Sequence, residues 1–111
     1  MPIPDAENAS ASQRKIHGYL LNPDHPKGGP KAAWFASLGY EREEWQILEK
    51  DLLAIALTCD QYGTERSVHG TKYLASGTLS RPGSRPAQVL TVWMVEGSEP
   101  PRFVTAYPHA S

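Results

Sequence analysis

One short loop holds the side-chain types that acid–base and phosphate chemistry require. The segment NPDHPKGGP, residues 22–30, contains His25 and Lys27, and Lys31 follows it directly. Histidine titrates near neutral pH, and lysine ammonium groups neutralise a phosphate or its transition state. The pair Gly28-Gly29 leaves backbone N–H groups approachable, and a helix starting at the end of the loop adds a positive dipole end. The loop is a candidate phosphate site. The alternative is that His25 hydrogen-bonds within a proline-rich turn while the lysines are solvated.

A second group of polar and aromatic side chains lies in two C-terminal runs that read as strands, residues 89–95 and 102–107. Strand alternation puts two pairs of side chains on single faces: Thr91 with Trp93, and Thr105 with Tyr107. If both pairs share a face, their hydroxyls and rings are available to a bound base or phosphate. Ordinary strand composition is the alternative, because threonine, tryptophan and tyrosine favour strands in any case.

Other chemistries lack their motifs. The four histidines are scattered, without a Cys/His or Asp/His cluster at ligand spacing, so we expect no metal cofactor. The sequence also lacks a Walker loop, a dinucleotide fingerprint and a serine nucleophile elbow. We therefore expect no bound cofactor and no nucleoside triphosphate chemistry.

Length and composition indicate one small globular domain. The 111 residues suffice for one core, and 40% hydrophobic with 21% charged residues is ordinary for a folded protein. The formal net charge of −1 argues against binding to nucleic acid through a generally basic surface, so any RNA contact must be local.

Cysteine content and hydropathy bear on the compartment. The single cysteine, Cys59, excludes an intramolecular disulfide, suits a reducing compartment and is expected to be a small buried side chain. No stretch approaches the roughly 20 apolar residues of a membrane span. We expect a cytoplasmic protein without membrane contact.

The N-terminal part divides into a tail and a short helix. Residues 1–12 are rich in Pro, Ala, Ser and Asn, with Ile3 as the one sizeable apolar side chain, and are expected to form a flexible tail before a single domain over residues 13–111. In residues 13–21, Ile16, Tyr19 and Leu20 recur at the spacing of one helix face.

Two further helices should supply most of the helical core. One follows Pro30 over residues 31–38, and Gly39 can take the left-handed cap behind it. The other spans residues 41–57, with acidic side chains near its start and apolar side chains at three–four spacing. The expected core residues are Trp34, Phe35, Leu38, Trp45, Leu48 and Leu52.

After residue 58 the pattern changes to strands. Residues 72–79 and 89–95 flank a Pro82-Gly83 turn, which predicts an antiparallel hairpin. Residues 102–107 give a third strand, and residues 60–70 a weak edge strand. The predicted fold class is α+β: two to three N-terminal helices packed on a three- to four-stranded antiparallel sheet.

Three stretches carry a resemblance to a known family: YLLNPDHPKGGPKAAWFASLGY at residues 19–40, GTKYLASGTL at residues 70–79 and VLTVWMVEGSEPPRFVTAYP at residues 89–108. Together they cover about half of the chain, in order. They resemble the domain-of-unknown-function family 6883, small bacterial domains that also occur at the C-termini of polymorphic toxins. That family looks like the barnase/EndoU/colicin/RelE (BECR) group of metal-independent ribonuclease toxins.

The resemblance implies helices on an antiparallel sheet, RNA as the substrate and a cognate immunity or antitoxin protein as a partner. Carried onto matching positions, it indicates six site residues: His25, Lys31, Thr91, Trp93, Thr105 and Tyr107.

Two functions remain open at this stage. In the first, the chain is a metal-independent endoribonuclease in which His25 acts as general acid or base on a ribose 2′-OH, giving a 2′,3′-cyclic phosphate. Lys31, with Lys27 or Arg102, would hold the phosphate; Thr91 and Thr105 would orient it, and Trp93 and Tyr107 would stack a base. In the second, the chain is a non-enzymatic protein-binding or assembly module on the same scaffold.

Overall fold

The helices come first along the chain and the strands follow, as the sequence predicts. The computed structural model describes residues 2–27 and 29–109. The helical elements are η1 (Ala6–Asn8), α1 (Gln13–Lys15), η2 (Ile16–Leu20), α2 (Gly29–Ser37), η3 (Arg42–Glu44) and α3 (Trp45–Thr58). The strands are β1 (Gly63–Ser67), β2 (Gly70–Leu79), β3 (Ala87–Val95) and β4 (Arg102–Pro108). The α+β fold class is confirmed.

The four strands form one antiparallel sheet in the order β1-β2-β3-β4. The predicted hairpin is β2–β3, and Gly83 in its turn has a φ of 81°, the left-handed conformation that favours glycine. The weak edge strand is β1, whose five residues are all exposed. Simple hairpin connections therefore arrange the whole sheet.

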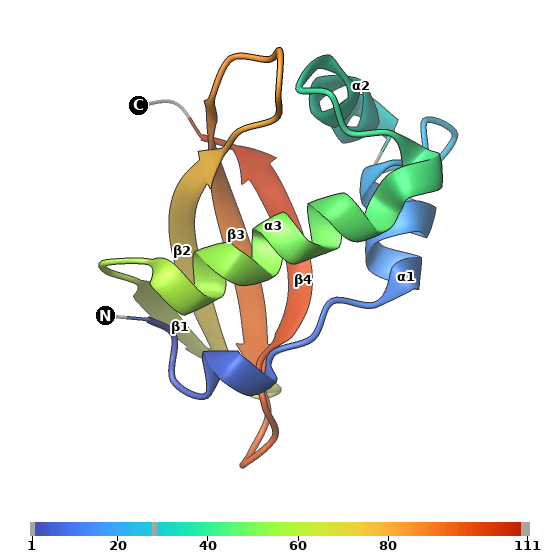
Figure 1. Ribbon diagram of the computed structural model, residues 1–111. Helices are drawn as coiled ribbons and strands as arrows, with labels where there is room; N and C mark the ends of the chain where they lie inside the picture. Colours follow the sequence, from blue (N-terminus) through green and yellow to red (C-terminus); the bar gives the residue numbers. More distant parts are fainter. Residues whose placement is uncertain (1, 28, 110–111) are drawn as a thin grey trace.

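Helix α3 lies across one face of the sheet, while α1 and α2 gather beside β4 (Figure 1). The α3 side chains Leu48, Leu52 and Ile55 are buried. At β2 the approach is so close that a Cβ on Gly77 would lie 2.7 Å from Ile55 Cγ1. The absence of a side chain at Gly77 thus sets how near α3 sits to the sheet. No helix in the described part of the chain is long and apolar enough to cross a membrane.

Most of the predicted helical core is buried. Phe35, Leu38, Leu48 and Leu52 belong to the core cluster, whereas Trp34 and Trp45 are half-buried and pack against its margin. Gly39, with a φ of 96°, follows α2 as expected. Next to it, the Tyr40 hydroxyl donates to Asp51 Oδ2 at 2.6 Å and joins the end of α2 to α3. Burial, together with this carboxylate, raises the pKa of Tyr40.

The expectation of a flexible tail over residues 1–12 is wrong for the residues described. Ile3, Ala6 and Ala11 are buried in the core, and the Ile3 N–H donates to the Ala56 carbonyl at 3.1 Å. Ser10 pairs with β4, accepting from the Phe103 N–H at 2.8 Å. A few apolar side chains suffice here because backbone hydrogen bonds to α3 and β4 hold the segment against the core, which composition alone does not reveal. Met1, Ala110 and Ser111 lie outside the described residues.

The position of α3 gives a stability prediction. Leu48→Ala removes a fully buried side chain, so we expect the free energy of unfolding to fall by about 2–5 kcal/mol. Leu57→Ala on the same helix is the matched control, because Leu57 is 45% exposed and should change stability by less than about 0.5 kcal/mol. Urea unfolding of the two variants measures both values. Equal losses would show that the buried face of α3 is wrongly assigned.

Candidate functional site

Four side chains from three segments meet at the β4 edge of the sheet. The Lys31 ammonium, from the first turns of α2, donates to the Tyr19 hydroxyl and to Thr105 Oγ1, each at 2.9 Å. The Tyr19 and Thr105 hydroxyls are themselves 3.0 Å apart. The ammonium also lies 4.0 Å from the centre of the Tyr107 ring. We call Tyr19, Lys31, Thr105 and Tyr107 the lysine cluster.

Local backbone geometry explains how each member reaches the cluster. Tyr19 lies in η2, a single π-helical turn closed by the Leu21 N–H donating to the Ile16 carbonyl at 2.9 Å. Such turns are rare and frequently found at functional sites. Thr105 and Tyr107 alternate along β4, so both point to the same side of the strand. Thr105 is 9% exposed and Tyr107 46% exposed, so the cluster has a buried side and an open side.

The charge of Lys31 changes the ionisation of Tyr19. Burial by itself raises the pKa of the Tyr19 phenol, but hydrogen bonds with Lys31 and Thr105 and the charges of Lys31 and Lys15 oppose it. The balance lowers the pKa of Tyr19 below the usual value for tyrosine. At a given pH, a larger fraction of Tyr19 is therefore ionised than of an unperturbed tyrosine, and the ionised form is the one that can accept a proton.

A cationic groove of about 720 Å³ adjoins the cluster. Tyr19, His25 and Thr105 line it, together with four cationic residues: Arg14, Lys15, Lys27 and Arg102. No carboxylate is among the described residues that line it. Arg102 forms an ion pair of 2.6 Å with Glu96, and because both side chains are about half exposed this pair is weak. A chain with net charge −1 thus concentrates positive charge at one place.

His25 combines a turn contact with a place in the groove. Its Nδ1 accepts from the Lys27 backbone N–H at 3.0 Å, so in this geometry a neutral imidazole carries its proton on Nε2. The ring also meets Tyr19 edge to face, with centroids 5.0 Å apart. His25 therefore organises the turn, as the alternative interpretation expects, and it also lines the groove.

The expectation that Thr91 and Trp93 share a face with Thr105 and Tyr107 is wrong. In the register of β3 and β4, Thr91 pairs with Ala106 and Trp93 with Phe103, whereas Thr105 pairs with Val92. Both side chains are fully buried: the Thr91 hydroxyl donates to the Ala75 carbonyl at 2.6 Å and accepts from Trp93 Nε1 at 2.8 Å. Neither reaches a ligand from the groove.

Gly29 has another role than predicted. Gly28 lies outside the described residues. The Gly29 N–H donates to the His25 carbonyl at 2.8 Å, and a Cβ on Gly29 would lie 2.7 Å from the Pro23 carbonyl oxygen. Gly29 therefore permits a tight loop and does not offer its N–H to a phosphate.

Sequence reasoning missed Tyr19, Arg14 and Lys15 as site residues. The spacing of Ile16, Tyr19 and Leu20 correctly gives a helix face, but only Ile16 and Leu20 are fully buried. A tyrosine at the margin of a buried face, next to two cationic residues, was the available signal. Among the described residues, no group of three or more His, Cys, Asp or Glu side chains is arranged to hold a metal ion.

Fold and site together define a small α+β domain that displays a lysine–tyrosine–threonine cluster beside a cationic groove. The chain belongs to the family described as "Domain of unknown function (DUF6883)", whose model matches residues 2–110. Its structure is similar to a chain of the contact-dependent growth inhibition toxin–immunity protein complex from Klebsiella pneumoniae 342, with a TM-score of 0.72 and 10% identity. The match covers 96% of this chain and 98% of that chain, and at this identity it shows a shared fold. Comparison with curated proteins gives no match.

The ionisation of Tyr19 can be measured directly. We expect tyrosinate absorbance, as the difference between wild type and Tyr19→Phe, to give a pKa below the usual tyrosine value. Lys31→Met should raise that pKa, because the hydrogen bond and the charge of Lys31 that lower it are then absent, while Lys50→Met on the exposed face of α3 should leave it unchanged.

The lowered pKa of Tyr19 also makes the stability of the fold depend on pH. Since the pKa of Tyr19 is lower in the folded state, its ionisation stabilises the fold as the pH rises through the folded value towards the unfolded one, and that contribution is lost as the pH falls back. Wild type should therefore gain stability over Tyr19→Phe in that alkaline window. A constant difference between the two would contradict the assignment.

Proposed function

We propose that this protein is a metal-independent endoribonuclease of the toxin type, acting at the lysine cluster. The observation that carries the proposal is the Lys31 ammonium bound to Thr105 and to a tyrosine of lowered pKa, two residues that line a cationic groove. These are the parts that cleavage of a phosphodiester by an adjacent hydroxyl requires: a proton acceptor, a fixed positive charge and a phosphate-binding surface.

The proposed reaction is attack of a ribose 2′-OH on the neighbouring phosphorus. The ionised form of Tyr19 accepts the 2′-OH proton as the new O–P bond forms, and Lys31 stabilises the negative charge that grows on the phosphate oxygens. As the bond between phosphorus and the 5′ oxygen breaks, His25 donates a hydrogen bond from Nε2 to that oxygen, which takes up a proton from solvent. The products are a 2′,3′-cyclic phosphate and a free 5′-OH.

RNA suits the surroundings of this cluster. Four cationic residues along the groove provide contacts for the phosphates on either side of the scissile bond. The half-exposed Tyr107 ring beside Lys31 offers a surface on which a base can stack. The 2′-OH serves as the nucleophile, so the same groove would bind DNA without cleaving it.

The shared fold supports the toxin assignment and suggests a partner. A chain of the same fold occurs in a toxin–immunity protein complex, and we extend this to a cognate immunity or antitoxin protein for the present chain. We place its action in the cytoplasm, where RNA is abundant and where reducing conditions suit a chain with one cysteine, Cys59.

The second candidate is a protein-binding module without catalysis. It is favoured by one feature: the Lys31 ammonium is already bonded by Tyr19 and Thr105, an arrangement that also serves simply to fix η2 and α2 to β4. The matched structure comes from a complex of two proteins, which is compatible with either role.

The test is cleavage of a labelled single-stranded RNA in the presence of a chelator. We expect wild type to give 2′,3′-cyclic phosphate ends, and a 2′-deoxy substitution at the cleaved position to abolish the reaction. Tyr19→Phe should lower the rate about 10²–10⁴-fold through loss of the proton acceptor. Lys31→Ala should lower it about 10²–10³-fold through loss of charge stabilisation.

Lys50→Ala is the matched lysine control, because Lys50 is exposed on α3 away from the groove. Its rate should equal that of wild type, and circular dichroism should show that all variants remain folded. Wild-type protein that leaves cellular RNA intact would favour the protein-binding module. Variants of Tyr19 and Lys31 as active as wild type would show that cleavage does not occur at the lysine cluster.

A further inference from the structure

Half of β2 has an open edge. Strand β1 pairs with the first half only, from Gly63 opposite Leu74 to Ser67 opposite Gly70. The second half, residues 75–79, pairs with β3 on one side. On its other side the described residues supply no strand. Every second residue there directs its backbone N–H and C=O outward, where they need a partner other than this sheet.

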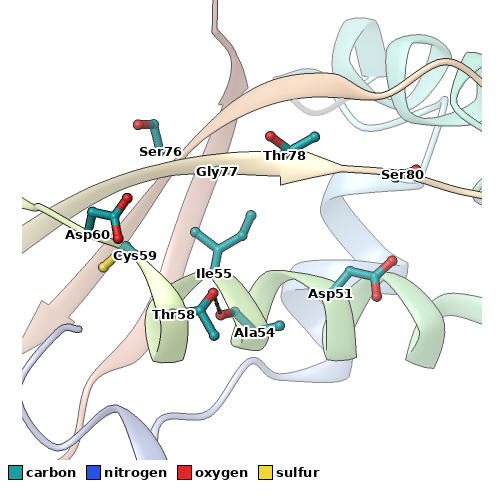
Figure 2. Close-up of a pocket in the computed structure, with 10 residues that line it drawn as sticks. All are labelled: Asp51, Ala54, Ile55, Thr58, Cys59, Asp60, Ser76, Gly77, Thr78 and Ser80. Atoms are coloured by element: carbon teal, nitrogen blue, oxygen red, sulfur yellow. Dashed lines mark hydrogen bonds between the residues drawn. The ribbon is translucent and has the colours of Figure 1, made fainter. Parts of the chain in front are cut away.

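A hollow of about 450 Å³ lies between this open edge and α3. Figure 2 shows Asp51, Ala54 and Thr58 of α3 on one side of the hollow and β2 on the other. Figure 2 also shows the Ser76 and Thr78 side chains on the side of β2 away from Ile55. The close contact of Gly77 with Ile55 holds the strand near the helix without filling the hollow. The hollow thus exposes backbone beside a helical wall.

The edge also lacks the usual protection against added strands. Natural edges carry lysine, proline or a bulge that prevents pairing with another chain. Residues 75–79 read ASGTL, with neither lysine nor proline, and their pairing with β3 is regular. By contrast, the exposed β1 edge carries Glu65 and Arg66. The open half of β2 is therefore suited to strand addition.

Charge decides between possible occupants. Asp51 and Asp60 line the hollow, and none of the described residues that line it is a lysine or an arginine. A second copy of this chain would bring the same carboxylates together from both copies, which like-charge repulsion disfavours. An extended segment carrying lysine or arginine is complementary instead.

We propose that residues 75–79 of β2 receive an extended, cationic segment of a partner protein, which adds a strand to the sheet beside α3. The site lies at the opposite edge of the sheet from β4 and its cationic groove (Figure 1). A partner bound here leaves the lysine cluster open. The proposal does not depend on RNA cleavage.

The probe is a blocked peptide about six residues long, a common strand length, that alternates valine or threonine with lysine. On its addition, the amide NMR signals of residues 75–79 should shift and their hydrogen exchange should slow. A peptide with glutamate in place of lysine should bind several-fold more weakly. A peptide with methylated backbone nitrogens, which cannot complete the ladder, should not bind.

Ala54→Arg and Ala33→Arg form a matched pair of variants, since both alanines are exposed on helices and only Ala54 lines the hollow. Ala54→Arg should abolish peptide binding, and Ala33→Arg should retain it. The proposal is overturned if the lysine peptide shifts no signal in residues 75–79, if Ala54→Arg binds it as wild type does, or if sedimentation shows a dimer that Ala54→Arg dissociates.

Discussion

The Lys31 ammonium joins parts of the chain that are far apart in sequence. Its two acceptors, Tyr19 and Thr105, stand 12 and 74 residues away from it. A partly buried ammonium must keep its donors bonded, because an unsatisfied buried charge costs more than a hydrogen bond contributes. This group therefore ties η2 and α2 to β4, in addition to the buried core side chains of both elements. The site depends on the same group, since these contacts also lower the pKa of Tyr19.

The two faces of the sheet carry different kinds of polar side chain: Thr91 on one face is bonded inside the core, and Thr105 on the other contacts Lys31. On the α3 side, Thr91 links Trp93 to the Ala75 carbonyl, which satisfies every buried donor in that chain of contacts. Thr105 and Tyr107 instead meet Lys31 at the β4 edge. The register shift between β3 and β4, after Val92, keeps Phe103 with Trp93 while Thr105 pairs with Val92.

The register shift between β3 and β4 explains why the sequence predicts the fold better than it predicts the site. Periodicity and turn residues place α3, the β2–β3 hairpin and β4, because each depends on neighbours in sequence. One irregular pairing decides which side chains of β4 lie on the same face of the sheet as Thr91 and Trp93 of β3. No local sequence pattern predicts that irregularity. Thr91 and Trp93 therefore entered the expected site, whereas Lys31, Thr105 and Tyr107 do meet. The sequence does not predict Tyr19 as a site residue, because three–four spacing gives the direction of its side chain but not the hydrogen-bond partners of its hydroxyl, Lys31 and Thr105.

The distribution of charge shows how a nearly neutral chain can serve two kinds of partner. Cationic side chains gather along the groove beside β4. The described lining of the hollow beside β2 includes Asp51 and Asp60 and contains no lysine or arginine. The two sites occupy opposite edges of one four-stranded sheet, so their fields weaken each other little at physiological ionic strength, where screening acts over about 8 Å. An anionic polymer is drawn to one edge and a cationic segment to the other. Net charge, which averages the two, says nothing about either.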